Sequence, residues 1–132
     1  MLKGNKRFLI MVLAFALPFG CVGCSDGTPA TYEQIGGAEA KALMDSESGY
    51  IIIDARTQSE YDEGHIPEAI LIPEYEIADR AEKELPNKKQ LILVYCRSGR
   101  RSKIAAEELV KLGYTNVKEF GGIIDWEYEI VK

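Results

Sequence analysis

The sequence has few cysteines, a single histidine and no excess of positive charge. Its three cysteines are Cys21, Cys24 and Cys96, and its one histidine is His65. This scarcity excludes a scaffold stapled by disulfides, a zinc site with four cysteine ligands, and any site that needs several histidine ligands. With 16 Lys and Arg against 21 Asp and Glu, the net charge is −5, whereas a nucleic-acid-binding domain needs a basic face. We therefore expect neither a bound metal ion nor a nucleic-acid partner.

The 132 residues are 46% hydrophobic and 28% charged, which is ordinary for a globular protein. This composition excludes a disordered chain, a collagen-like chain and a multi-span membrane protein. The length fits one compact domain. No internal repeat or low-complexity segment is visible.

The first 25 residues differ from the rest. Three cations within the first seven residues precede the uncharged run Phe8–Phe19 (FLIMVLAFALPF). A basic start, an apolar stretch and a small-residue exit are typical of a secretory signal peptide. The uncharged stretch continues to Ser25, at the lower limit for a membrane-spanning helix. An uncleaved anchor therefore stays as an alternative, although Pro18, Gly20 and Gly23 interrupt its second half.

The end of this segment resembles a bacterial lipobox, in which small residues precede a lipid-modified cysteine. Val22-Gly23-Cys24 fits that pattern, while Cys21 stands where the pattern prefers Leu. Cys24 is the expected lipidation site and Cys21 its rival, with an ordinary secretory peptide as the remaining alternative. We expect a signal peptide over 1–23, a flexible tether over 24–30 and a folded domain over 31–132. Cleavage would remove three cations and no anions, which shifts the net charge from −5 to −8.

Strands and helices are expected to alternate along the domain. Short apolar or β-branched runs predict strands, and apolar residues at helical spacing predict helices. The expected strands are Thr31–Ile35, Tyr50–Ile53, Ala69–Ile72, Leu91–Tyr95 and Val117–Phe120, and the expected helices are Gly37–Asp45, Ser59–Glu63, Glu74–Leu85, Ser102–Leu112 and Ile123–Ile130. This order predicts a three-layer α/β fold, with a mostly parallel sheet covered by helices on both faces. Ligands of such sheets bind at the carboxyl ends of the strands, here near Asp54, Pro73, Cys96 and Gly121.

Cys96 opens a loop, Cys96-Arg97-Ser98-Gly99-Arg100-Arg101-Ser102, between an expected strand and an expected helix. Such a loop can point successive backbone N–H groups inward, and the helix N-terminus adds partial positive charge. Gly99 permits the required turn. A thiol in this cradle should have a pKa below its free value and act as a nucleophile toward an anion held there. The alternative is a buried structural cysteine near surface arginines.

Three blocks of the domain resemble the single-domain rhodaneses, a family of sulfurtransferases. Asp54-Ala55-Arg56-Thr57, with Glu60-Tyr61 and Gly64-His65-Ile66-Pro67, is similar to the family's D-x-R…E-[YF]-x-x-G-H-I-P-G-A. The Cys96–Ser102 loop is similar to C-R-S-G-x-R-S, and Gly121-Gly122-Ile123 with Trp126 to G-G-[IVM]-x-x-W. The blocks keep the family order, with Glu68 in place of the usual Gly.

The resemblance implies that Cys96 takes a sulfane sulfur from a donor such as thiosulfate and holds it as a persulfide. A thiol or cyanide then accepts the sulfur, and no cofactor is needed. The amides of Arg97–Ser102 would stabilise the anions, with Arg97, Arg100 and Arg101 as candidates for contacting the donor. Asp54 is expected to order nearby loops, Arg56 and Glu60 to pair with each other or with the backbone, and His65 to make a structural hydrogen bond. Together with the lipobox, this predicts a lipid-anchored protein on the outer face of the cell membrane, with a periplasmic or secreted protein as the alternative.

Other functions remain open at this stage. Cysteine phosphatases use a C-x5-R loop, but the residue that follows the five intervening positions here is Ser102, and Arg101 closes a loop one residue shorter. This count disfavours a phosphatase and an arsenate reductase. A persulfide carrier or sulfur-sensing module with little thiosulfate turnover stays as the main alternative.

Overall fold

The computed structural model describes residues 31–132, which form a five-stranded sheet with helices on both faces. The strands lie in the order β1-β5-β4-β2-β3, and each neighbouring pair is parallel. Their bounds are β1 Glu33–Gln34, β2 Ile51–Asp54, β3 Ile70–Leu71, β4 Ile92–Cys96 and β5 Val117–Gly122. All carboxyl ends therefore meet at one edge, where a ligand site is expected.

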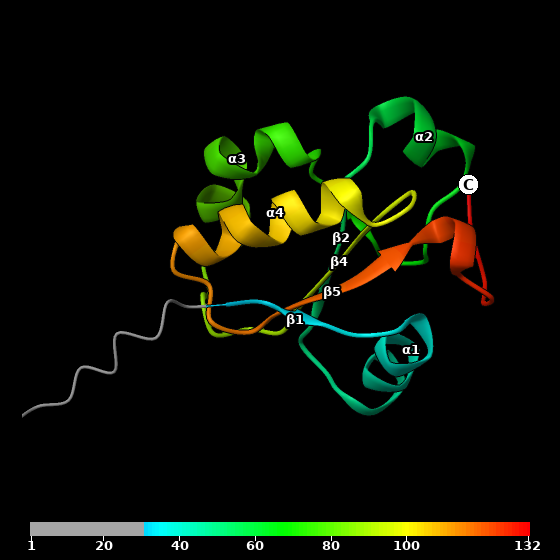
Figure 1. The fold of residues 1–132 in the computed structure, drawn as a ribbon, viewed down its shortest axis with the longest axis horizontal. Coiled ribbons are helices and arrows are strands. Elements are labelled where there is room, and N and C mark those ends of the chain that lie inside the picture. Colours follow the sequence, from blue (N-terminus) through cyan, green and yellow to red (C-terminus); the bar gives the residue numbers. More distant parts are fainter. Residues whose placement is uncertain (1–30) are drawn as a thin grey trace, which may run out of the picture.

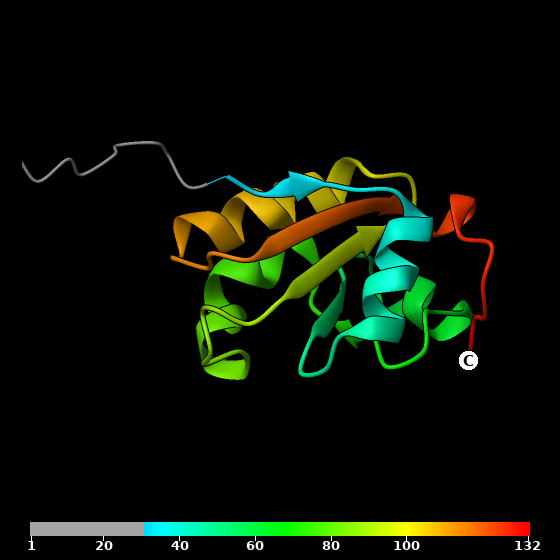
Figure 2. The same cartoon turned by 90° about the horizontal axis from the view of Figure 1, so that it is seen from below.

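The helices form the two outer layers. Helix α1 covers one face of the sheet, and α3 and α4 cover the other (Figure 1). Figure 2 shows the same layers from below, with α1 in front of the strands. The bounds are α1 Gly37–Ser46, α2 Gln58–Glu63, α3 Ile77–Glu84 and α4 Arg100–Lys111, with short 3₁₀ turns η1 Glu74–Glu76 and η2 Ile123–Asp125. The predicted three-layer α/β fold is confirmed.

The central strand β4 is buried along its whole length, and its alternation supplies both cores. Ile92, Val94 and Cys96 belong to the core beneath α3 and α4. Leu93 and Tyr95 belong to the core beneath α1. Period-two alternation thus places Cys96 on the same side of the sheet as the first turn of α4.

The prediction of a C-terminal helix over Ile123–Ile130 is wrong. Only η2 is helical, and Trp126 is already extended, with φ −81° and ψ 117°. The segment makes its backbone hydrogen bonds elsewhere: Val131 and His65 form an antiparallel bridge with two N–H···O bonds of 2.9 Å. The last residues therefore close over the loop before β3 instead of forming a helix.

Two further helices differ from expectation. Helix α4 begins at Arg100 and not at the predicted Ser102, so Arg100 and Arg101 lie in its first turn. The predicted helix Glu74–Leu85 consists of η1 followed by α3, which begins at Ile77. The chain therefore makes a tighter turn after Pro73 before the regular helix starts. In residues 31–132, none of the helices combines the length and apolarity needed to cross a membrane.

Candidate functional site

Cys96 is the last residue of β4, and the loop that follows curls around its sulfur. The residue is only 1% exposed. Gly99 has a left-handed backbone, with φ 108°, and this turn aims its N–H at Cys96 Sγ, 3.0 Å away. The Ser102 hydroxyl lies 3.4 Å from the same sulfur. Glycine at position 99 is thus required by the turn that brings an amide to the thiol.

The loop is seated against the end of β5. Ile124 N–H donates to the Arg97 carbonyl at 3.2 Å. Gly122 lies so close to the loop that a Cβ atom there would sit 2.0 Å from the Arg97 carbonyl oxygen. The glycine pair at the end of β5 therefore supports the Cys96 loop, and any side chain at position 122 would displace it.

The surroundings of the sulfur favour its anionic form. Burial raises the pKa of the Cys96 thiol, while hydrogen bonds from the backbone N–H groups of Ser102, Gly99 and Ser98 lower it, and the pKa lies below its ordinary value. The first turn of α4 begins at Arg100, so the partial positive charge of the helix N-terminus acts in the same direction. The arrangement can hold a sulfur anion without any metal ion. In residues 31–132 no group of three metal-ligating side chains is placed to bind one.

The three loop arginines have different environments. Arg97 and Arg100 are exposed, and within residues 31–132 neither forms an ion pair. Arg101 makes a two-point contact with Glu60, at 2.7 and 2.8 Å. The hydrogen bond from Arg101 holds the pKa of Glu60 down to about 2. Arg97 and Arg100 are therefore free to meet an anion, whereas Arg101 ties α4 to α2.

Asp54 lies in a buried polar network beside the loop. It is 0% exposed; Oδ1 accepts from Arg56 Nε at 2.9 Å, and Oδ2 accepts from Arg56 Nη2 at 2.6 Å and Tyr95 Oη at 2.7 Å. Arg56 also donates to the Gly64 carbonyl at 2.7 Å. The expected ordering role of Asp54 fits these bonds. Arg56 and Glu60 do not pair with each other, but both bond to the backbone, which was the expected alternative: Arg56 donates to Gly64 O and Glu60 accepts from Thr57 N at 3.0 Å. Their side-chain partners are Asp54 for Arg56 and Arg101 for Glu60.

His65 makes the kind of structural contact that the sequence predicts. Its Nδ1 lies 2.9 Å from the Tyr61 carbonyl oxygen. Its ring stacks on that of Tyr61, with 3.7 Å between centroids. With its backbone bridged to Val131, the residue fastens the C-terminal segment to the loop before β3.

Glu119 is a residue of the site that the sequence analysis did not identify. It lies on β5, is 3% exposed, and its Oε1 accepts from Ser102 Oγ at 2.6 Å and from Gly121 N at 2.8 Å. The signal was available: Val117 and Glu119 are two apart on one strand and so share a face. A carboxylate in the register of a core-facing Val marks a position that needs buried hydrogen-bond donors.

A pocket of about 250 Å³ borders the loop. Its lining combines charged and apolar side chains from the end of β2 to α2, from the loop and from η2: Arg56, Glu60, Glu63, Arg97, Ile123 and Ile124. Arg97 and Ile124 are exposed at its rim. The pocket is a concave surface that meets the loop at Arg97, and Cys96 is not among its lining residues.

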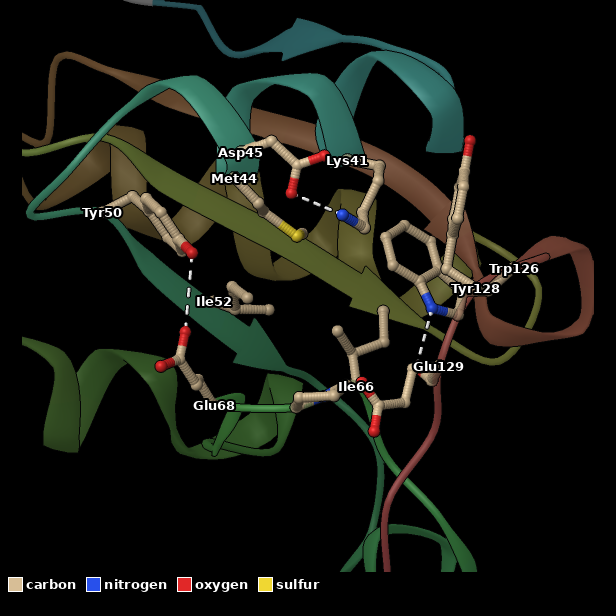
Figure 3. Close-up of a pocket in the computed structure, with 11 residues that line it drawn as sticks. Lys41, Met44, Asp45, Tyr50, Ile52, Ile66, Glu68, Trp126, Tyr128 and Glu129 are labelled. Atoms are coloured by element: carbon tan, nitrogen blue, oxygen red, sulfur yellow. Dashed lines mark hydrogen bonds and ion pairs between the residues drawn. The ribbon is translucent and has the colours of Figure 1, made fainter.

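A second pocket, of about 170 Å³, lies beside α1 and is separate from the Cys96 loop (Figure 3). Its floor is apolar, with Ile52 and Ile66 at the centre of the view. Its polar groups contact one another: Lys41 with Asp45, Tyr50 Oη with Glu68 at 3.5 Å, and Trp126 Nε1 with the Glu129 carbonyl at 3.1 Å. None of the nucleophilic or unpaired basic groups of the loop lines it.

Comparison with known proteins gives consistent results. Residues 37–129 match the family model described as Rhodanese-like domain. Thiosulfate sulfurtransferase PspE of Escherichia coli (strain K12) is 40% identical over 73 residues, which cover 55% of this chain and 70% of that protein. A sulfurtransferase of Allochromatium vinosum is 38% identical over 88 residues, covering 66% and 79%. A solved structure described as a rhodanese with anions, from E. coli, has a TM-score of 0.60 at 37% identity and covers 63% of this chain and 98% of that one.

Proposed function

The chain belongs to the rhodanese-like domain family, and on that basis we propose that it is a sulfurtransferase with Cys96 as its nucleophile. The substrate class is a small anionic sulfane donor, such as thiosulfate, and the acceptor is a thiol or cyanide. The observation that carries the proposal is the contact of Gly99 N with Cys96 Sγ at 3.0 Å. It places a sulfur of lowered pKa in an amide cradle at the start of α4.

The proposed reaction has two steps. The Cys96 thiolate attacks the outer sulfur of thiosulfate, an S–S bond forms to Cys96, and the S–S bond of thiosulfate breaks to release sulfite. Cyanide or a thiolate then attacks the outer sulfur of the persulfide, which restores the Cys96 thiolate. Charge is conserved in both steps, and a covalent intermediate of this kind predicts ping-pong kinetics.

The cradle suits the anions of this reaction. The amides that stabilise the thiolate are placed to stabilise a persulfide anion, whose outer sulfur lies about 2 Å beyond Sγ. Arg97 and Arg100 are the cations available to a dianionic donor and to departing sulfite, because Arg101 is bound to Glu60. No metal or organic cofactor enters the steps.

The Cys96 loop is also shorter than the phosphate-binding loop of a cysteine phosphatase. Where a cysteine phosphatase has its arginine, this chain has Ser102, which is 0% exposed and faces the sulfur. Arg101 precedes it and points to Glu60. The loop therefore lacks an inward arginine that could clamp three phosphate oxygens, and sulfur transfer is the reaction that it fits better.

A persulfide carrier is the second candidate, because Cys96 is 1% exposed. A sulfur atom so covered can exchange efficiently only with a reagent that reaches past the loop or with a partner that displaces it. Turnover with thiosulfate and cyanide separates the two candidates. An enzyme turns over free thiosulfate, whereas a carrier accepts sulfur only from the persulfide of another protein.

The direct test is the intact mass of residues 31–132 after incubation with thiosulfate. We expect wild type to gain the mass of one sulfur atom and to lose it on addition of cyanide. Cys96→Ser is expected to gain nothing. A wild type that gains no sulfur from thiosulfate or from a protein persulfide, or an equal gain by Cys96→Ser, contradicts the proposal.

We further propose that residues 1–23 are a lipoprotein signal peptide, that residues 24–30 are a tether, and that Cys24 carries a lipid on the outer face of the membrane. Support comes from the residue pattern alone, since these residues lie outside the part that the structure describes. Labelling with a fatty-acid probe in a bacterial host tests the proposal. We expect Cys24→Ala to abolish labelling and Cys21→Ala to retain it; the reverse result assigns the lipid to Cys21, and an unlabelled wild type contradicts lipidation.

A further inference from the structure

The Ser102 hydroxyl has one proton and four acceptors within reach. Its Oγ lies 2.6 Å from Glu119 Oε1, 3.0 Å from the Gly99 carbonyl oxygen, and 3.4 Å from both the Gly121 carbonyl oxygen and Cys96 Sγ. A hydroxyl can donate only one strong hydrogen bond at a time. The distance to Glu119 is in the range of a charge-assisted O–H···O⁻ bond, which is stronger than a neutral one. Ser102 therefore donates to Glu119 and turns its lone pairs toward the sulfur.

The Glu119 side chain is buried and is held in this position by a second hydrogen bond. It is 3% exposed, and Oε1 also accepts from Gly121 N at 2.8 Å. Gly99, which supplies the amide to Cys96, packs against the same oxygen: a Cβ there would lie 3.8 Å from it. One carboxylate oxygen thus contacts both the helix residue and the strand turn that frame the Cys96 loop.

The surrounding charges leave Glu119 without a compensating cation. On β5, Lys118 pairs with Glu33 of β1. The neighbours of Glu119 in the sheet are Gln34 on β1 and Val94 on β4, both uncharged. On α4, Arg101 acts on Cys96 but is bound to Glu60, while Arg100 and Lys103 are exposed. Within residues 31–132, no Lys or Arg forms an ion pair with Glu119.

We propose that Glu119 is a positioning residue that holds the Ser102 hydroxyl proton away from Cys96, so that only backbone amides stabilise the sulfur anion. The consequence is a less stabilised and more nucleophilic sulfur. The thiolate part of this proposal stands on geometry alone, and its extension to the persulfide rests on the proposed function. In the release step cyanide attacks the outer sulfur and the Cys96 thiolate is the leaving group, so a thiolate stabilised by fewer hydrogen bonds leaves more slowly.

Glu119→Gln tests the proposal through the pH dependence of Cys96 alkylation by iodoacetamide, a neutral reagent. The Gln amide can donate to Ser102 Oγ, which frees the hydroxyl to donate to the sulfur. We expect the thiol pKa to fall by about one unit and the limiting rate constant at high pH to fall by about threefold. Glu107→Gln, which removes the same charge from the exposed side of α4, is the matched control and is expected to change neither value.

Loosened packing around the loop would raise the alkylation rate without lowering the pKa, so it is distinguishable from the positioning role. An unchanged or raised thiol pKa in a folded Glu119→Gln variant overturns the proposal. Ser102→Ala provides a second test if Glu119→Gln does not fold. We expect its thiol pKa to stay within about 0.3 units of wild type, whereas a rise of one unit shows that the hydroxyl already donates to the sulfur and overturns the proposal.

Sulfur loading from thiosulfate is measured separately by intact mass. A wild type that fails to load sulfur contradicts the proposed function, while the thiol pKa of Glu119→Gln still decides the positioning role. If both hold, Glu119→Gln is expected to release its sulfur to cyanide about threefold faster than wild type, because its Cys96 thiolate is the better leaving group. Equal or slower release would overturn the extension to the persulfide.

Discussion

A side chain on Gly122 would collide with the carbonyl group of Arg97. A Cβ atom there would lie 2.0 Å from the oxygen and 2.4 Å from the carbon, and both are backbone atoms that no rotamer change can move. We expect Gly122→Ala to lower the free energy of unfolding by about 3 kcal/mol and to abolish sulfur loading on Cys96. Urea denaturation and intact mass measure the two effects.

Gly36→Ala is the control for this substitution. Gly36 has an ordinary φ of −83° and nothing within 4 Å of a Cβ atom. Because Gly36 is the N-cap of α1, we expect Gly36→Ala to lower the free energy of unfolding by about 1 kcal/mol or less and to load sulfur like wild type. A Gly122→Ala variant that behaves like Gly36→Ala would show that the loop does not depend on this close approach.

Arg97 and Arg100 should contribute to binding of the anionic donor. Arg97 and Arg100 are exposed and unpaired within the described residues, so we expect Arg97→Ala and Arg100→Ala each to raise KM for thiosulfate by about three- to tenfold, with little change in kcat. Lys103→Ala removes the same charge from the exposed part of α4 and is expected to leave KM unchanged. An equal effect of Lys103→Ala would mean that only the overall charge matters.

The sequence predicts most of the fold because its strands are short apolar or β-branched runs that stand out in composition. The apolar run of β4 indicates a buried strand, and the Gly after α4 indicates the end of a helix. The C-terminal segment was predicted as a helix because its apolar residues are spaced compatibly with one, but Val131 bonds to His65, which is distant in sequence. Such a bond cannot be read from local spacing.

The candidate site also has a part that could be predicted from local sequence and a part that depends on contacts distant in sequence. Cys96, Gly99 and Ser102 lie within seven consecutive residues, from the end of β4 to the first turn of α4, so their proximity follows from the sequence. The partners of Arg101 and Ser102 lie 41 and 17 residues away, at Glu60 and Glu119. Pairing among Asp54, Arg56, Glu60 and Arg101 depends on which ends of α2, β2 and α4 meet, and this is set by packing of the whole domain.

The Glu60–Arg101 pair should make stability depend on pH. The pKa of Glu60 is lowered to about 2, chiefly by the hydrogen bond from Arg101, so its contribution is full above the unfolded value of about 4.5 and is lost as pH falls toward 2. The Glu60 side chain is 25% exposed, which weakens the pair through solvent screening. We expect the stability difference between wild type and Glu60→Gln to shrink by about 1 kcal/mol between pH 7 and pH 3.

Glu108→Gln is the control for this pH dependence, because Glu108 pairs with Lys111 on the outer side of α4. Its stability difference from wild type is expected to change by less than about 0.5 kcal/mol over the same range. Urea denaturation at the two pH values measures both variants. A constant difference for Glu60→Gln would contradict the lowered pKa.

Glu68 stands in a conformation that favours glycine. It is the one non-glycine residue with positive φ in the described part of the chain, at 67°. A left-handed backbone costs a residue with a side chain about 1–2 kcal/mol. A glycine avoids this cost, but part of the gain is offset because glycine loses more conformational entropy on folding. We expect Glu68→Gly to raise the free energy of unfolding by about 0.5–1 kcal/mol. Thermal and urea denaturation measure the gain, and a less stable variant would show that the contact of Glu68 with Tyr50 outweighs the strain.

Tyr95 should matter for stability and not for sulfur chemistry, although it directly precedes Cys96. Its hydroxyl donates to Asp54 at 2.7 Å and accepts from Ile66 N at 3.1 Å, and burial raises its pKa, so it remains a neutral donor. Tyr95→Phe leaves the buried Ile66 N–H without its acceptor, and we expect a loss of about 1–3 kcal/mol. Because Tyr95 and Cys96 face opposite sides of the sheet, sulfur loading of the folded variant should equal that of wild type. Tyr75→Phe, at an exposed position, should change neither property, and a Tyr95→Phe variant that is stable but fails to load sulfur would place the Tyr95 hydroxyl in the reaction itself.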